Sequence, residues 1–332
     1  MRRVVAGMAA GSMVGAALGA VAQRLAEAGD LRRFPMPGRL VDVDGVLLHV
    51  VVEGAGPVVL IDSGLGGSCL EWAPVATDLV RDFTVVRYDR PGFGWSPGAN
   101  CDRTALAAAR RIRGLISALD LSGPVLLVGH SLGGLHARVV ASLYPEIVSG
   151  VVLVDPSHED MLDDPSTARS AAVMNRVMSL VARTARLGTP RLVGPLYTRM
   201  TTSQIRTALD DETRSALRRS TLLTASSVAG MRGAVAEMVA LPASLREAKG
   251  LAPLASVPVT LITAGAAPVS ANEGKARAVI RSLHESVVDA ASCGRLVVAE
   301  QSGHLVPIDE PELVAQCVRE TAATAAAASA KA

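Results

Sequence analysis

Two hydrophobic periods alternate along most of the chain. Short apolar runs, which are typical of buried β-strands, are followed by longer stretches whose apolar residues recur every three or four positions, as in amphipathic helices. Strands that alternate with helices build βαβ units, so the pattern predicts a mostly parallel central sheet with helices on both faces. We expect the strands at 39–43, 46–52, 58–62, 84–88, 125–128, 151–154, 257–263 and 295–299.

The helices between these strands follow from the same periodicity. Asp44-Gly45 separates the first two strands and predicts a hairpin. The last helix should begin after Pro311, and the alanine-rich end at 321–332 is expected to be a disordered tail. The remaining core helices are expected at 72–79, 104–119, 132–143 and 272–283.

The alternation stops after the sixth strand. No strand is predicted from about residue 158 to residue 250, where apolar residues keep a helical period. A structureless loop of that length is implausible. We therefore expect a helical cap (lid) at 157–250, inserted into a sheet domain that comprises 39–156 and 251–320. The helices of the cap are expected at 171–186, 204–217 and 228–239.

The first thirty residues have a different character. Arg2 and Arg3 precede an uncharged stretch from Val4 to Ala22, which ends in small residues. This pattern at 1–30 favours a secretory signal peptide or an N-terminal membrane anchor. It places the protein in the cell envelope, anchored or secreted, with an alanine-rich helix of a cytoplasmic protein as the alternative.

Composition narrows the function classes. The net charge is only +2 and aromatic residues make up 2% of the chain, which argues against a nucleic-acid partner. The four cysteines have no metal-binding spacing, so no metal site is expected. Export would permit one disulfide, but we favour buried free thiols. No cofactor-binding motif is present.

The chemistry centres on residues 129–133. The run Gly129-His130-Ser131-Leu132-Gly133 is a G-x-S-x-G sequence that lies between an apolar strand and a predicted helix. In that setting the serine occupies a tight turn and its hydroxyl is exposed at the edge of the sheet. Ser131 is therefore the candidate nucleophile.

Four segments together resemble the α/β-hydrolase superfamily, and most closely its capped esterases, lipases and haloperoxidase-like hydrolases. The resemblance covers roughly residues 39 to 320. It implies the α/β-hydrolase fold and a triad in the order serine, acid, histidine. The segments are Asp62-Ser63-Gly64-Leu65-Gly66-Gly67, Tyr88-Asp89-Arg90-Pro91-Gly92-Phe93-Gly94-Trp95-Ser96, Gly129-His130-Ser131-Leu132-Gly133-Gly134 and Ser302-Gly303-His304.

His304 is the candidate base, because it follows the last strand, where the triad order requires the histidine. His130 adjoins the serine, but its side chain is expected to point away from the site. His49 lies in the hairpin, remote from the strand ends.

The triad acid departs from the commoner pattern. No carboxylate follows the strand at 257–263, where the resemblance leads us to expect one. Some relatives place the acid after the preceding strand, and in this chain that position is Asp155, at the active edge of the sheet. Glu159, Asp160 and Glu273 are the alternatives.

The oxyanion hole requires two N–H donors. The backbone of Leu132 should supply one, and by the resemblance the backbone of Leu65 should supply the other. We expect Asp89 and Arg90 to pair and stabilise a turn.

Together these residues predict a serine hydrolase that cleaves a carboxylic ester through an acyl-enzyme. The cap is rich in Met, Leu and Ala, which favours an apolar acyl substrate among small molecules. Perhydrolysis and C–C bond cleavage are compatible with the same triad. A ligand-binding protein of slight or no activity on this fold is the alternative from another class.

Overall fold

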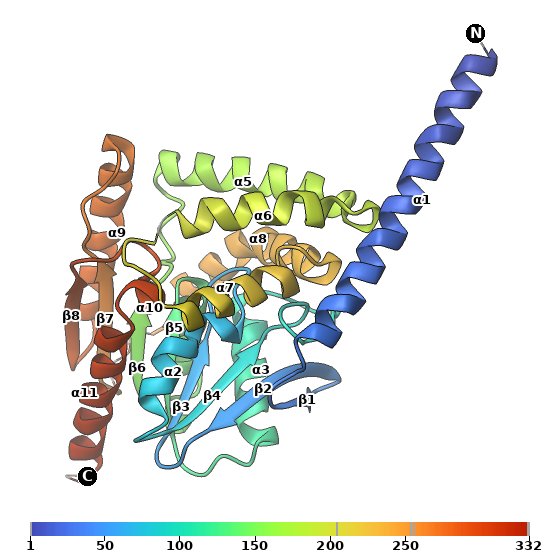
Figure 1. Ribbon diagram of the computed structural model, residues 1–332. Coiled ribbons are helices and arrows are strands. Elements are labelled where there is room, and N and C mark those ends of the chain that lie inside the picture. The colour runs from blue at the N-terminus through green and yellow to red at the C-terminus, as the bar shows by residue number, and fades with distance from the viewer. Residues whose placement is uncertain (1, 204, 253, 255, 331–332) are drawn as a thin grey trace.

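The computed structural model describes residues 2–203, 205–252, 254 and 256–330, and its centre is one eight-stranded sheet (Figure 1). The strand order is β1-β2-β4-β3-β5-β6-β7-β8. The two pairs that involve β2 are antiparallel and all other pairs are parallel, which confirms the predicted sheet. The strands are β1 (Arg39–Val43), β2 (Val46–Glu53), β3 (Val58–Asp62), β4 (Thr84–Asp89), β5 (Val125–His130), β6 (Val148–Val154), β7 (Val259–Ala264) and β8 (Gly294–Ala299).

Helices cover both faces of the sheet. On one face the core is formed with α3, α4, α9 and the end of α8, and on the other with α2 and α11. These helices and the short turns beside them are η1 (Cys69–Trp72), α2 (Ala73–Leu79), α3 (Ala105–Ala118), α4 (Leu132–Leu143), η2 (Pro145–Ile147), α9 (Ala271–Asp289), α10 (Val306–Asp309) and α11 (Pro311–Ser329).

The central strand β5 shows why the sheet needs two helical layers. All six of its residues are buried. Leu127 contributes to the core on one face, whereas Leu126 and Val128 contribute to the core on the other. Successive side chains of a strand point to opposite faces, so an uninterrupted apolar run requires cover on both sides.

The segment between β6 and β7 is helical, as expected, but its helices differ from the predicted ones. The stretch at 189–202 forms a helix that the pattern did not predict, and the helix expected from 204 begins only at Asp211, with Asp210 as its N-cap. We call Pro165–Lys249 the helical insertion. It contains α5 (Pro165–Arg183), η3 (Ala185–Leu187), α6 (Thr189–Thr202), α7 (Asp211–Leu223) and α8 (Val228–Lys249).

The N-terminal segment forms a single helix, α1 (Arg2–Arg33), whose first half projects from the body (Figure 1). Its second half packs on the helical insertion. The Gln23 side-chain amide donates to the Ser226 carbonyl at 2.9 Å, and the Glu27 carboxylate accepts from the Val228 N–H at 2.7 Å.

Among the described residues, α8 is the one helix whose length and hydropathy would suit a membrane span. It is instead a packed helix of the insertion: Glu237 and Leu245 on it are buried, and its end contributes to the sheet core.

The C-terminal end differs from the expected disordered tail. Helix α11 continues to Ser329, and Thr321 and Ala325 on it are buried. The Thr321 hydroxyl lies 2.7 Å from the Thr260 hydroxyl of β7. Alanine-rich sequence frays when nothing holds it, but here one face of the helix packs on the sheet. Residues 331–332 lie outside the described residues.

This contact gives a test of the C-terminal helix. Thr321→Val keeps the side-chain shape but leaves the buried Thr260 hydroxyl without its partner, so unfolding free energy should fall by about 1–3 kcal/mol. Thr324→Val removes an exposed hydroxyl that bonds only within the helix, and serves as the control. Urea titration measures both, and equal values for the two variants would show that the end of α11 contributes no tertiary stability.

Candidate active site

A strained turn joins β5 to α4. Ser131 has φ 54° and ψ −117°, outside the conformations that a residue with a side chain ordinarily adopts. Its N–H donates to the Val154 carbonyl of β6 at 3.1 Å, and its carbonyl accepts from the Ser157 N–H at 2.9 Å. Both bonds connect the turn to the neighbouring strand and the chain that follows it.

Two glycines permit this turn. A Cβ atom on Gly129 would lie 2.3 Å from the Gly133 carbonyl oxygen, and a Cβ on Gly133 would lie 2.4 Å from the carbonyl oxygen of Asp62. Neither distance is compatible with a side chain. The motif therefore consists of two positions where backbone must approach backbone, with the serine between them.

The structure brings the three predicted side chains into one line. His304 Nε2 lies 3.1 Å from Ser131 Oγ, and His304 Nδ1 lies 2.6 Å from Asp155 Oδ2. His304 is positioned by the loop between β8 and α10, and Asp155 by the end of β6. With Nδ1–H donating to the carboxylate, Nε2 carries the lone pair that faces the serine hydroxyl.

Asp155 is held in place on its other side. Its Oδ1 accepts from the Ala264 N–H at 3.0 Å, and its own N–H donates to the Ile262 carbonyl at 2.7 Å, so both contacts come from β7. Burial by itself raises the pKa of this carboxyl, but the hydrogen bond and charge of His304 outweigh it and hold the pKa below its ordinary value. Asp155 is ionised at neutral pH.

The alternative acids have other partners. Both Glu159 oxygens accept from Arg138, at 2.5 and 2.8 Å, and Asp160 pairs with Lys249 at 2.6 Å. Glu273 pairs with Arg277 at 2.6 Å on α9. None of these three carboxylates bonds to His304, whose partner is Asp155.

His130 differs from expectation, because its side chain turns toward the site. Its ring centre lies 4.7 Å from that of His304, and its Nε2–H donates to the His304 carbonyl at 2.7 Å. Burial, followed by the charge of His304, lowers the pKa of His130 to about 3. A neutral His130 therefore holds the loop that carries His304 in place, and it adds no positive charge beside the His304 ring.

A second histidine that the sequence did not single out lies behind the acid. His284 of α9 is fully buried; its ring nitrogens lie 2.9 Å from the Pro156 carbonyl and 3.0 Å from the Thr263 hydroxyl. Its Nδ1 is 4.0 Å from Asp155 Oδ1. Burial lowers the pKa of His284, so the ring acts as a neutral support for the turn that carries Asp155.

The loop after β3 faces the serine. A Cβ on Gly64 would lie 2.9 Å from the His130 ring and 3.4 Å from Ser131 Cβ. The Gly67 N–H closes a turn on the Gly64 carbonyl at 3.0 Å. Among the described residues, the backbone N–H groups of Leu65 and Leu132 donate to no partner, which leaves both free for a ligand oxygen.

A buried arginine supports this loop from behind. Arg90 donates to the carbonyls of Ser63 and Gly64, each at 2.6 Å, and to Asp62 Oδ1 at 2.7 Å. On its other side Arg90 forms a bidentate salt bridge with Glu237 of α8, with N–O distances of 2.7 and 3.0 Å.

This arrangement corrects the expected pairing of Asp89 with Arg90. Asp89 instead accepts from His49 Nδ1 at 2.7 Å and from the Cys69 N–H at 2.8 Å. The arginine and the aspartate point into different clusters, because adjacent residues at a strand end face opposite ways.

His49, Cys69 and Asp89 form a buried group of metal-ligand types within the described residues. Both ring nitrogens of His49 already face acceptors, Asp89 on one side and the Pro37 carbonyl on the other. Neither ring nitrogen faces an open position that a metal ion could take, so the group stabilises the turn after β4. Cys69 and Cys317 are buried free thiols as expected, but Cys293 is exposed.

A cavity of about 500 Å³ opens beside the triad. Asp155 and His304 line it, together with Arg206 of the helical insertion and Glu273 and Arg277 of α9. These charged groups face the cavity, whereas Met178 and Met231 of the insertion pack into a core around Phe93. The methionine content that suggested an apolar acyl group therefore belongs to helix packing.

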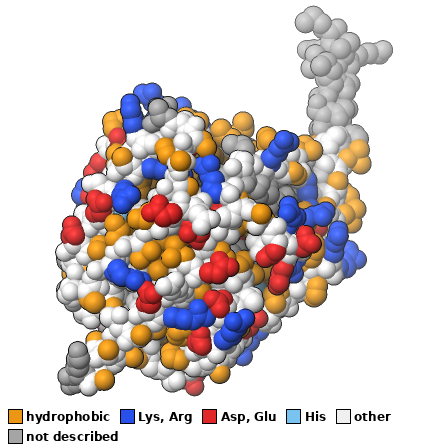
Figure 2. Space-filling view, turned by 60° about the vertical axis from the view of Figure 1, so that its left-hand side comes forward, with side chains coloured by type: hydrophobic (Ala, Val, Ile, Leu, Met, Phe, Trp, Pro, Cys, Tyr) orange, Lys and Arg blue, Asp and Glu red, His pale blue; other side chains and the backbone are white. Residues whose placement is uncertain are grey.

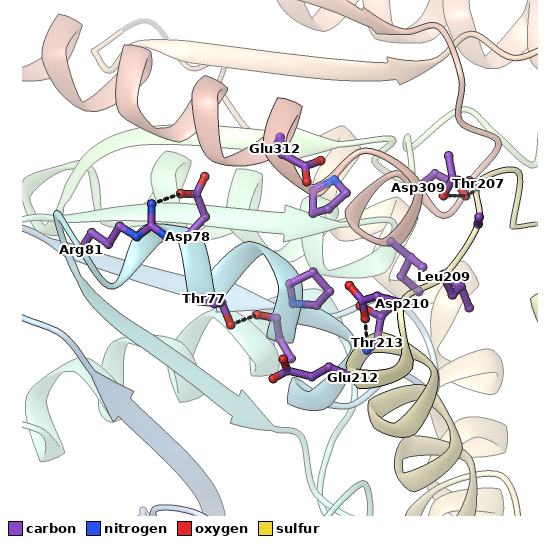
Figure 3. A pocket seen from close by; sticks show the side chains of 15 residues that line it. Thr77, Asp78, Arg81, Thr207, Leu209, Asp210, Glu212, Thr213, Asp309 and Glu312 are labelled. Atoms are coloured by element: carbon purple, nitrogen blue, oxygen red, sulfur yellow. Dashed lines mark hydrogen bonds and ion pairs between the residues drawn. The ribbon is translucent and has the colours of Figure 1, made fainter.

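A second cavity of about 470 Å³ lies between α2, the start of α7 and α10–α11 (Figure 3). It shares no residue with the first. Two of its acidic side chains already have local partners: Asp210 accepts from the Thr213 N–H, and Asp78 binds Arg319. Its lining residues include no nucleophile that is hydrogen-bonded to a base, so this cavity is not the candidate active site.

The chain matches the family described as "Alpha/beta hydrolase family" over residues 58–317. That span includes the turn at Ser131, the acid position and the histidine loop. The protein therefore belongs to the α/β-hydrolase family, as the sequence resemblance predicts.

The chain is also similar to individual curated proteins over part of its length. The chain is 37% identical to an uncharacterized protein of Mycobacterium tuberculosis over 31% of this chain and 30% of the relative. It is 33% identical to the 2-(acetamidomethylene)succinate hydrolase of Mesorhizobium japonicum over 39% of this chain and 46% of the relative. Matches to these curated relatives thus span half of their length or less.

Among solved structures, a thermophilic esterase from Thermogutta terrifontis superimposes with a TM-score of 0.63 at 22% identity. The superposition covers 86% of this chain and 98% of the esterase. At this identity the likeness establishes the fold.

The Arg90–Glu237 pair is open to direct test. Glu237→Gln leaves the buried Arg90 short of one counter-charge, so we expect unfolding free energy to fall by about 3 kcal/mol. The matched control is Glu285→Gln, which breaks an exposed pair on α9 and should cost less than about 1 kcal/mol. Urea titration measures the loss of unfolding free energy in both variants. If Glu237→Gln loses no more than the control, the buried pair does not hold the helical insertion to the loop after β3.

Proposed function

We propose that this protein is a serine hydrolase that cleaves a carboxylic ester through an acyl-enzyme. The observation that carries the proposal is the continuous line of Ser131, His304 and Asp155, with distances of 3.1 and 2.6 Å. A serine hydroxyl is a weak nucleophile unless a base takes its proton, and this geometry supplies the base and its orienting carboxylate.

In the first half-reaction Ser131 Oγ attacks the ester carbonyl carbon while His304 Nε2 takes the hydroxyl proton. The Leu65 and Leu132 N–H groups stabilise the negative oxygen of the tetrahedral intermediate. The C–O bond then breaks, the alcohol leaves with the proton from His304, and the acyl group stays on Ser131.

In the second half-reaction water attacks the acyl-enzyme. His304 takes one proton from the water, a second tetrahedral intermediate forms in the same oxyanion site, and the acid leaves as Ser131 recovers its proton from His304. Asp155 keeps its charge throughout and stabilises the imidazolium form of His304 in each half-reaction.

The cavity beside His304 supports a small substrate. Its volume of about 500 Å³ is in the range of small-molecule sites, and its wall combines the charged Arg206, Glu273 and Arg277 with the apolar Val269, Ala276 and Ile280. Such a mixed wall supports a small acyl substrate that has both a polar and an apolar part.

Cleavage of an amide or a C–C bond is compatible with the same three residues, and one relative is named a 2-(acetamidomethylene)succinate hydrolase. We favour the ester because the site needs no group beyond the triad and the two N–H donors to complete ester cleavage.

A fluorophosphonate probe tests the nucleophile. The wild-type chain should be labelled at Ser131 and should hydrolyse p-nitrophenyl acetate, whereas Ser131→Ala should lose labelling and at least about 10³-fold in turnover. Folded wild-type chain that resists the probe would refute the proposal in favour of an inactive, ligand-binding member of the family.

The identity of the acid is tested by a matched pair of variants. Asp155→Asn should lower kcat by about 10³–10⁴-fold, because the amide favours the wrong imidazole tautomer. Glu273→Gln removes a carboxylate from the same cavity and should leave kcat close to that of wild type. An unimpaired Asp155→Asn would exclude Asp155 as the triad acid.

Acyl-chain length tests the substrate class. Turnover of p-nitrophenyl esters should be highest for acetate or butyrate and should decline toward laurate, because Arg206, Glu273 and Arg277 interrupt the apolar wall along which a long chain would lie. A preference for laurate in initial-rate measurements below micelle formation would restore the apolar acyl substrate.

A further inference from the structure

The outer helices of the insertion carry exposed apolar side chains that no part of the described chain covers. Leu180 of α5 and Leu192 of α6 are 65% and 79% exposed. The two helices form the outermost layer on the upper side of the molecule (Figure 1). We call the surface the α5–α6 face; its apolar members are Val173, Val177, Leu180, Leu187, Leu192 and Leu196, all exposed.

The charged residues of the segment that forms α5, η3 and α6 have one sign. From residue 165 to residue 202 the sequence contains six arginines and no acidic residue. On α5 three of them share the helical face of the exposed apolar residues, because Arg169, Arg176 and Arg183 alternate with Val173 and Leu180 at spacings of three or four. A helix with apolar and basic side chains together on its exposed surface is typical of binding at the headgroup level of an anionic bilayer.

The face of the molecule in Figure 2 has a mixed charge pattern, with acidic and basic side chains intermixed over the body. The net charge of the whole chain is only +2, so the six arginines of one short segment are a local concentration of charge. Arginine can also extend its guanidinium to phosphate while its stem stays among apolar side chains.

Helix α1 adjoins this face and extends it. Gly19 packs so closely on the insertion that a Cβ atom there would lie 2.3 Å from the Leu187 carbonyl oxygen. Asp30 pairs with Arg191 of α6. Leu18 and Val21 are exposed on α1, and the first half of the helix, which contains most of the uncharged run that begins at Val4, projects past α5 and α6 (Figure 1).

The contact at Gly19 bears on the fate of the N-terminal helix. It lies before the small residues at 20–22 that resemble a cleavage site. Cleavage there would remove a backbone contact that the fold has built with glycine. In the uncleaved chain this contact holds the α5–α6 face next to the point where α1 leaves the body.

A second copy of the chain is a poorer occupant of the same surface. A twofold interface would set the arginines of one α5–α6 face against those of the other. We infer that the α5–α6 face docks on an anionic lipid bilayer into which the first half of α1 inserts.

Reporter tryptophans in the full-length chain test the docking. Leu192→Trp places a fluorophore on the α5–α6 face, Leu18→Trp places one on α1, and Leu47→Trp, in the exposed part of β2, is the matched control. Each is mixed with vesicles of phosphatidylcholine and phosphatidylglycerol that contain spin-labelled lipid, and wild-type emission is subtracted.

We expect the emission of Leu192→Trp and Leu18→Trp to shift to the blue and to be quenched, and that of Leu47→Trp to be unchanged. Adding Arg176→Glu and Arg183→Glu to Leu192→Trp should abolish its quenching, as should vesicles of phosphatidylcholine alone. Circular dichroism checks that each variant is folded.

Three results would overturn the inference. Quenching of Leu18→Trp without Leu192→Trp would mean that α1 inserts while the insertion stays free of the bilayer. Absence of quenching at both positions would exclude membrane contact. A lipid-free, concentration-dependent blue shift of Leu192→Trp would assign the face to a second copy of the chain.

Discussion

The site depends on one backbone constraint, the turn that places Ser131 at φ 54° between β5 and α4. Such a conformation costs about 1–3 kcal/mol for a residue with a side chain. It persists because the backbones of Gly129 and Gly133 touch, the Ser131 N–H is bonded to β6, and β5 is buried on both faces. The strain is local, and the whole sheet core holds it in place.

A buried charge cluster connects this turn to the helical insertion. Arg90 binds Asp62 of β3, the carbonyls of the loop that carries Leu65, and Glu237 of α8. Burial alone would raise the pKa of Asp62, but Arg90 and His136 hold it at about 2. The loop over Ser131 and the helical insertion therefore share the charge of Arg90. Movement of α8 would shift Arg90 and with it the loop that carries the Leu65 N–H.

The pattern of apolar residues and glycines predicted those elements of the fold that depend on neighbouring residues in the sequence. The apolar runs predicted the strands, and helix α4 begins at the predicted residue because the turn before it requires glycine at fixed positions. Helix α6 and the ordered end of α11 were missed, since contacts from distant segments stabilise them. For the site, motif order led to His304 and strand order led to Asp155. The inward ring of His130 and the Arg90–Glu237 pair could not be predicted, because each depends on a partner more than a hundred residues away in the chain.

The central claim is that Ser131 carries the acyl group during turnover. Rapid acid quenching of the full-length enzyme with an activated acetate ester, followed by peptide mass spectrometry, measures this directly. The account predicts an acetyl adduct on the peptide that contains Ser131, formed in the first turnover and absent from Ser131→Ala. Ester hydrolysis that proceeds with this peptide unmodified, and that survives in Ser131→Ala, would contradict it.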